Sequence, residues 1–471
     1  MRGMVILVET SGHRIRHLAK RIELSAKSRW GRFWLSIAAT ATTGRVIKID
    51  AIEELNLRES GVLPSRRNRA LVGLRKNWYL AERLQRLGKY HEAVRIREEI
   101  LSQLYDYQGI KSQNYYPPFL GTQWSSNFGH LTAIGHLQLA QSLDIVTNGT
   151  RFVLDNSKPA NKQLFKAMTC KMQVVRQVNG NNWSELPEFW HVAERIRTIR
   201  GKNGFIDGVK LFDEIFAPEN LETLERYYFK LDEDYIDSSS DKLQKIGLPK
   251  NSPFVTLHVR ESFSQLDPRT QPRETYFRAI EELNNKGIWV VRIGDSGMEK
   301  FPQFSRFIDL VQQPDAGREF HAYLLSNCEF FVGTASGPSW VPRLFGKPSL
   351  ITNINEIGTQ MSRGPKATIY LPKRFIHQNG QPLSMREVFE MKFGFASLDR
   401  KELKTKGFAL EHNSESEISS AVNEILNTYR DSSPRFSVTP PSIQLLRSEF
   451  QAVGNGNFAR SYIEQNQEFF K

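Results

Sequence analysis

The sequence predicts an α/β protein with two parallel-sheet domains and a helical N-terminal extension. Two observations predict this class. Short apolar runs typical of strands alternate with helical segments, first over 106–245 and again, more regularly, over 246–430. The chain of 471 residues is also too long for one ordinary core, and 39% hydrophobic residues suffice to build more than one.

Residues 1–105 are predicted to form a basic helical extension. The first 100 residues hold 21 Lys and Arg against 10 Asp and Glu, so most of the net charge of +13 lies there. We expect residues 1–75 to contact an anionic membrane surface, because Arg and Lys alternate with Leu, Ile, Trp and Phe in a roughly helical pattern. Nucleic acid is not expected, since aromatic and basic residues hardly interleave. A basic surface without a special partner is the alternative.

Residues 78–104 show helical spacing on both sides of a break at Gly88, with Ala93 as a small contact. This pattern resembles a single tetratricopeptide repeat, and without a second copy we expect a lone hairpin docked on the next domain.

The compartment predicted from the sequence is the cytoplasm, at the inner face of the membrane where residues 1–75 bind. No run of 18 uncharged apolar residues occurs, so no membrane-spanning helix is expected. Cys170 and Cys328 stand in apolar contexts and are interpreted as core thiols. In this compartment the N-glycosylation sequons at Asn148 and Asn182 are not expected to be glycosylated.

The first domain, 106–245, is expected to contain strands at 150–156 and 172–178 around a helix at 162–170. An apolar helix should follow the glycine-rich turn that includes His130. Residues 186–245 are predicted mostly helical, and the serine-rich segment Asp237–Pro253 is predicted to be the linker to the second domain.

The second domain, 246–430, is expected to be a doubly wound sheet whose ligands bind beyond the carboxyl ends of its strands. Residues 431–471 are predicted as a separate helical tail. The expected strands are 253–262, 288–295, 306–311, 328–334 and 348–353, with helices at 273–287, 318–327 and 338–346.

Two strand ends of this sheet carry polar residues. Strand alternation puts His258 and Arg260 on one face, where the arginine offers a fork of donors matched to a phosphate. An ion pair with a nearby acid is the alternative for Arg260. After the next strand, Gly294 permits close approach of a ligand and Asp295 suits a ribose hydroxyl, with helix capping as the alternative.

A third strand runs into a turn of small residues before a proline. Backbone N–H groups at the start of the following helix, with its positive dipole end, would suit a diphosphate. The turn matches neither a Walker loop nor GxGxxG. With the other two strand ends it predicts a nucleotide-diphosphate pocket. Its residues are Gly333, Thr334, Ala335, Ser336 and Gly337.

HVRES, WVVRIGD and FFVGTASG…VPRLFGKPSLITN resemble, in order and spacing, a family of bacterial glycosyltransferases for cell-surface saccharides. The same residues resemble, more distantly, the HxR-containing fucosyltransferases of GT-B fold. NFGHLTAIGHL, at 127–137, is similar to the Gly-His-Leu turn of the first family's first domain. The residues after HVR depart from the fucosyltransferase pattern, and this departure argues against GDP-fucose as the donor.

The resemblance implies a GT-B enzyme with two Rossmann-like domains facing a cleft. Arg260 would contact the diphosphate of a nucleotide-sugar donor, with His258 and Asp295 flanking the nucleotide or sugar. Transfer to a saccharide or lipid-linked acceptor would be inverting and would need neither metal nor other cofactor. His130 is the candidate general base, and Glu261 is the second.

Three other interpretations remain open. The sequence DED at Asp232–Asp234 fits the metal-binding DxD pattern of another glycosyltransferase class, although a solvated acidic segment explains it better. A basic scaffold or nucleic-acid-binding protein would use only the N-terminal segment. A sugar-nucleotide epimerase would share the fold, and fold alone does not choose between transfer and epimerisation.

Overall fold

The structure is a computed structural model that describes the second half of the chain almost continuously. The predicted membrane contact at 1–75, the break at Gly88 and both sequons lie outside the described residues. The described residues are 77, 80–81, 83–84, 89, 92–93, 95–100, 119–120, 128–146, 151–154, 159–170, 173–176, 198–201, 204–261, 267–313, 318–365, 367–391, 393–395, 400–430, 439–450 and 453–471.

The smaller of two α/β units is built on a parallel sheet in the order β1-β2-β3. Helix α9 begins at Asn161, whose side-chain oxygen accepts hydrogen bonds from the next free backbone N–H groups. The strands and the helices predicted here are confirmed. The bounds are β1 Phe119–Leu120, α8 Phe128–Ser142, β2 Arg151–Leu154, α9 Lys162–Thr169 and β3 Gln173–Arg176.

Between the units, two predictions are wrong in part. The described part of the segment predicted as mostly helical includes an antiparallel hairpin, and α13 runs through much of the predicted linker. This helix forms because acidic residues fill its first turn, lysines fill its last turn, and Leu243 is fully buried. The bounds are β4 Thr198–Gly201, β5 Gly204–Asp207, α11 Gly208–Ile215, η2 Pro218–Asn220, α12 Leu221–Leu224 and α13 Glu233–Lys245.

The larger unit has a seven-stranded parallel sheet in the order β14-β11-β10-β9-β6-β7-β8. All five predicted strands are present, and the mixed α/β class is confirmed. The central strands are nearly continuous apolar runs because helices cover both of their faces. The bounds are β6 Phe254–His258, β7 Trp289–Arg292, β8 Phe307–Asp309, β9 Phe331–Thr334, β10 Ser349–Ile354, β11 Ile369–Pro372 and β14 Asn457–Phe458.

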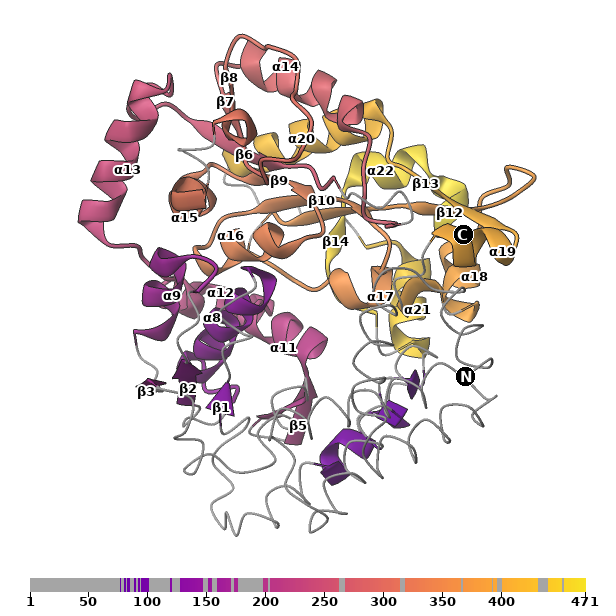
Figure 1. Cartoon of the computed structure of the whole chain (residues 1–471). Helices are drawn as coiled ribbons and strands as arrows, with labels where there is room; N and C mark the ends of the chain where they lie inside the picture. Colours follow the sequence, from indigo (N-terminus) through magenta and orange to yellow (C-terminus); the bar gives the residue numbers. More distant parts are fainter. Residues whose placement is uncertain are drawn as a thin grey trace, which may run out of the picture.

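Helices lie on both faces of this sheet (Figure 1). Helices α14, α20 and α22 cover one face, and α15 and α16 lie on the other, between the sheet and α8 of the smaller unit. The bounds are η3 Arg273–Tyr276, α14 Phe277–Asn285, η4 Leu310–Gln312, η5 Arg318–Phe320, α15 His321–Asn327, η6 Gly337–Trp340, α16 Val341–Leu344, α17 Ile357–Gln360, β12 Arg374–His377, α18 Met385–Glu390, η7 Phe393–Phe395, α19 Arg400–Thr405, β13 Phe408–Glu411, α20 Glu415–Arg430, α21 Pro441–Glu449, α22 Arg460–Gln465 and η8 Gln467–Phe470.

The C-terminal segment predicted as a separate tail returns to the large sheet. Strand β14 pairs with β11, and α22 packs on α20. Glu424 of α20 accepts hydrogen bonds from the backbone N–H groups of Arg460 and Ser461. A strand of two residues leaves no periodic signal in the sequence, which is why the prediction missed it.

The two units meet along α8 and α11. A Cβ placed on Gly337 would lie 2.8 Å from the backbone nitrogen of Gly129, so the two backbone segments touch where η6 and α8 begin. Asp213 of α11 accepts hydrogen bonds from the backbone N–H groups of Arg363 and Asn455. Apolar packing and buried hydrogen bonds therefore both join the units.

Two predictions about single features have different outcomes. Cys328 is buried, as predicted, but Cys170 is exposed, because it follows the last turn of α9 and its side chain turns outward. Both are free thiols. Within the described part of the chain, no helix combines the length and the apolarity needed to cross a membrane.

Candidate functional site

The sheet brings the three predicted strand ends together. Strand β6 lies between β7 and β9, and all three run parallel. The residues after β6, the Gly294–Asp295 pair after β7 and the turn after β9 therefore lie side by side at one edge of the sheet.

His258 ends β6 and is held by the turn after β9. Its Nδ1 lies 3.1 Å from the Ser336 hydroxyl, which also donates to the carbonyl of Thr334 at 3.2 Å. A serine hydroxyl has one proton. With that proton on Thr334, His258 donates from Nδ1 and keeps Nε2 as an acceptor. Burial, and then the charges of His321 and Arg260, lower the pKa of His258 to about 3, so the ring is neutral at pH 7.

The small-residue turn braces the neighbouring strand. The Thr334 hydroxyl accepts a hydrogen bond from the backbone N–H of Arg260 at 3.1 Å. Ser336 precedes the four-residue helix η6, and its backbone N–H donates to the Ser339 hydroxyl at 3.3 Å. These groups are engaged inside the protein, so they give no support to the predicted diphosphate cradle. Ala335 is half-buried against the core.

Two of the predicted site glycines, Gly333 and Gly294, are also closely packed against other protein atoms. A Cβ on Gly333 would lie 2.3 Å from the carbonyl oxygen of His258. A Cβ on Gly294 would lie 2.5 Å from the sulfur of Met298 and 2.9 Å from Val311. Gly333 has no room for a side chain because backbone atoms of β6 occupy the space, whereas a side chain at Gly294 would require the Met298 and Val311 side chains to shift.

Asp295 forms an exposed ion pair with Arg318, at 3.0 Å. Both side chains are mostly exposed, at 69% and 79%, so the pair adds little stability. Helix capping, the alternative in the sequence, is not its role here. Its carboxylate remains at the edge of the sheet, where the charge also acts on His258 and His321.

Arg260 belongs to a cluster with more positive than negative charge. Arg269 binds both oxygens of Asp267 at 3.0 Å, and Arg260 reaches the same carboxylate at 3.3 Å. The expected ion-pair alternative for Arg260 therefore exists, yet two guanidinium groups share one carboxylate. The Arg260 Nε is buried and has no hydrogen-bond partner among the described residues. Burial opposes ionisation of Asp267, but the two arginines outweigh it and lower its pKa to about 2.

Lys373, which the sequence analysis did not single out, lies under the same loop. It follows β11 directly, is fully buried, and donates from Nζ to the carbonyl of Pro268, next to Asp267. Burial, and then the charge of Arg400, lower the pKa of Lys373 to about 7. In the sequence Lys373 follows a short apolar run, but this run is not among the expected strands, so the lysine could not be placed at the strand ends.

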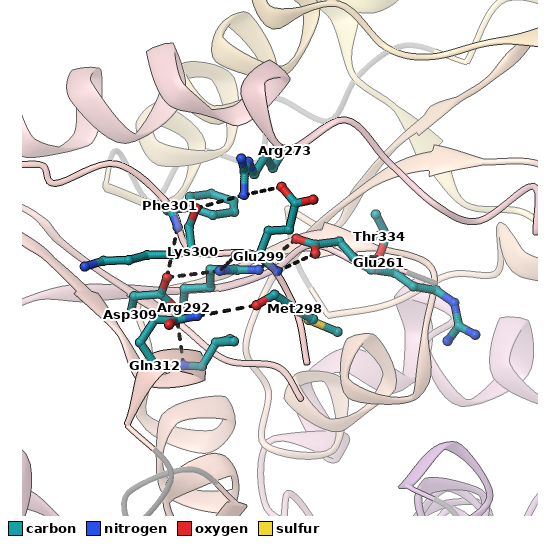
Figure 2. A network of polar contacts seen from close by, with 12 residues as sticks. Glu261, Arg273, Arg292, Met298, Glu299, Lys300, Phe301, Asp309, Gln312 and Thr334 are labelled. Carbon is teal, nitrogen blue, oxygen red and sulfur yellow. Dashed lines mark hydrogen bonds and ion pairs between the residues drawn. The ribbon is translucent and has the colours of Figure 1, made fainter. Parts of the chain in front are cut away.

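Glu261, the second candidate for the general base, has a structural role. Its carboxylate binds Arg292 at 2.9 Å and accepts the backbone N–H of Glu299 at 2.7 Å (Figure 2). Arg292 is fully buried, lies over the ring of Phe301 at 4.0 Å, and also binds Asp309 at 3.0 Å. Alternation from Arg260 puts Glu261 on the opposite side of the chain, and this pattern could have excluded it.

His130 lies in the first turn of α8 rather than in a loop, and its side chain is exposed. Most residues of this helix from 131 to 140 are buried, whereas His130 precedes that stretch. His130 is next to Gly129, which touches Gly337 of the larger unit. The smaller unit therefore presents this histidine close to the strand-end edge.

Asp232–Asp234 begins α13 rather than a metal site. The Asp232 carboxylate binds Lys166 at 2.8 Å. Negative charge at a helix start is stabilised by the helix dipole. Across the described ranges, no three His, Cys, Asp or Glu side chains gather as a metal site.

No protein-family model and no curated protein matches the sequence. Among solved structures, it is similar to the glycosyltransferase family 9 protein of Veillonella parvula, with 12% identity and a TM-score of 0.34 over 65% of this chain and 96% of that chain. It is similar to ADP-heptose LPS heptosyltransferase II of E. coli, with 12% identity and a TM-score of 0.37 over 67% and 99%. The E. coli heptosyltransferase WaaC with ADP has 12% identity and a TM-score of 0.28 over 59% and 99%.

Proposed function

We propose that this chain is a glycosyltransferase that moves a sugar from a nucleotide-diphosphate sugar to a saccharide or lipid-linked acceptor. The observation that carries the proposal is Arg260. It stands beyond the carboxyl end of β6, where ligands of open parallel sheets bind. It shares the single carboxylate of Asp267 with Arg269, and its buried Nε has no partner within the described ranges. The Arg260 side chain is 30% exposed, so a phosphate would bind the open part of its guanidinium group and offset the excess charge.

The diphosphate is proposed to lie at the Arg260 cluster rather than on the N–H groups of the turn after β9. Arg269 adds positive charge beside Arg260, and Lys373, with its pKa lowered to about 7, adds part of a charge under the same loop. His258, neutral and fixed by Ser336, would accept a hydrogen bond from the donor at Nε2. The motif resemblance to surface-saccharide glycosyltransferases supports a sugar nucleotide over other diphosphates.

The reaction is proposed to be inverting on a GT-B arrangement. The acceptor hydroxyl oxygen attacks the anomeric carbon, and the bond from that carbon to the diphosphate oxygen breaks, with its electron pair leaving on the diphosphate. Arg260 stabilises this negative charge without a metal. His130, presented by the smaller unit, takes the acceptor proton. Residues 1–75 would hold the enzyme at the cytoplasmic membrane surface.

The test is a thermal-shift panel of GDP-, UDP-, ADP- and CMP-sugars with EDTA present. One compound should raise the melting temperature of the wild type but not that of Arg260→Ala. Arg278→Ala, which removes an exposed helical ion pair with Glu282, is the matched control and should respond like the wild type. If no compound stabilises the wild type, or stabilisation needs a metal, the proposal is wrong.

A further inference from the structure

His321 is a buried histidine that none of the predicted roles uses. It is the first residue of α15 and is only 7% exposed. Its Nε2 is fully buried and has no hydrogen-bond partner within the described part of the chain. A buried polar atom without a partner lowers stability by about 1–3 kcal/mol, so it calls for an explanation.

The position of His321 links it to the strand-end edge. After burial, the charge of protonated His321 is the largest cause of the lowered pKa of His258. The pKa of His321 is in turn raised by Asp295 and lowered by Arg318. Its ring meets the edge of Phe128, at the start of α8, with 6.1 Å between centroids. Phe128 also lies against Gly337, at the end of the turn after β9, where a Cβ on the glycine would be 3.3 Å from the Phe128 Cβ. His321 therefore lies where the two units meet, separated from the turn after β9 by the ring of Phe128.

The ring is neutral, which limits what it can bind. Burial lowers its pKa to about 4, and the nearby carboxylate of Asp295 only partly opposes this. A neutral imidazole nitrogen suits a hydroxyl group, to which it can donate or from which it can accept one hydrogen bond. It would not attract a phosphate by charge, and that role falls to Arg260.

A second histidine shows what a purely structural origin would look like. His136 of α8 is also buried with an unpartnered Nε2, but three aromatic rings, those of Phe212, Phe216 and Trp340, surround it. Its Nδ1 donates within its own helix, to the carbonyl of Thr132 at 2.8 Å. His136 is therefore an internal reference for a buried histidine among rings of the core.

We infer that His321 binds a hydroxyl group of the nucleotide-sugar donor through Nε2, as a specificity-determining residue of the donor site. This inference rests on the proposed function. Both the ribose and the transferred sugar carry hydroxyl groups, and the experiment must separate these two sources.

The test measures dissociation constants by calorimetry for UDP, ADP and GDP and for UDP-glucose, ADP-glucose and GDP-mannose. His321→Phe keeps the ring and its contact with Phe128 but removes Nε2, and it should weaken binding about tenfold, the effect of leaving one buried hydroxyl unpaired. His321→Gln places an amide near the position of Nε2 and should restore part of the affinity. His136→Phe, the same substitution at the reference site, should bind like the wild type.

The outcomes separate the two proposals. Weakening of both the nucleotide and its sugar ester assigns the ribose hydroxyl, whereas weakening of the sugar ester alone assigns the transferred sugar. If the wild type binds a probe and His321→Phe binds it equally well, or His136→Phe weakens it as much, the inference about His321 is wrong while the proposed function stands. If the wild type binds no probe, the proposed function itself fails.

Discussion

The Nδ1 of His258 and the hydroxyl of Ser336 lie 3.1 Å apart and join the end of β6 to the turn after β9. The two residues are 78 positions apart in the chain. The bond orients a neutral imidazole at the strand-end edge, so the small-residue turn supports the site by positioning His258.

Ser336→Ala should remove this support. The variant leaves His258 buried with an unpaired ring nitrogen, which should lower the free energy of unfolding by about 1–3 kcal/mol. Donor binding should weaken as well, because the ring is no longer fixed. Urea denaturation and calorimetry would measure the two effects. Ser448→Ala, which removes an exposed hydroxyl bonded within its own helix, is the control and should change neither. Unchanged stability and binding in Ser336→Ala would contradict the role given to this bond.

Gly333→Ala should be strongly destabilising. The added Cβ would lie 2.3 Å from the carbonyl of His258, so the paired strands must separate, at a free-energy cost of about 3 kcal/mol. Gly247→Ala is the comparison: it has open space but a φ of 108°, and should cost about 1 kcal/mol from backbone strain alone. Thermal unfolding of both variants checks the order, and equal effects would contradict the steric explanation for Gly333.

Glu261→Gln should affect stability and leave catalysis nearly intact. The substitution removes one of two charges that neutralise the buried Arg292, which should cost about 2 kcal/mol. The rate of sugar transfer should stay within about threefold of the wild type, since binding groups lie elsewhere. His130→Ala should instead lower the rate about 100-fold or more with little change in stability. A large loss of rate in stable Glu261→Gln would restore Glu261 as the base.

Several parts of the fold and site follow from local sequence. Apolar runs that end in HVR and IGD gave both the strands and the polar residues at their carboxyl ends, because a buried strand and its last residues are adjacent in the chain. The five strands and the shared edge of the site could be predicted for this reason.

Other parts depend on residues far apart in the sequence. Gly333 and Gly294 are needed because of His258 and Met298, which no local pattern identifies. Lys373 belongs to the site only because the segment with Asp267 and Pro268 lies against the end of β11, where Lys373 donates to the Pro268 carbonyl. Strand β14 comes from a segment that looks like a tail. Long-range packing decides each of these features.

Stability should depend on pH through Lys373. An unfolded lysine has a pKa of about 10.4. In the folded protein, burial and then the charge of Arg400 lower the pKa of Lys373 to about 7. Between these values the unfolded chain holds the extra proton, so raising the pH favours the folded state. Below pH 7 both states hold it, and the cost of burying the charge is greatest.

Lys373→Met should remove this dependence. Urea denaturation at pH 7, 8 and 9 should show wild-type stability rising relative to the variant as the pH increases. A constant difference would mean that Lys373 stays charged when folded, bound more strongly than its contact with Pro268 indicates.

Arg260 is proposed to bind the diphosphate of a sugar nucleotide. The most direct measurement is the dissociation constant, by calorimetry at fixed ionic strength, of the nucleotide-sugar that stabilises the wild type. Removing a charge-assisted hydrogen bond should weaken binding of this compound to Arg260→Ala about 10- to 100-fold, and Arg278→Ala should bind it like the wild type. Equal dissociation constants for wild type and Arg260→Ala would contradict the account.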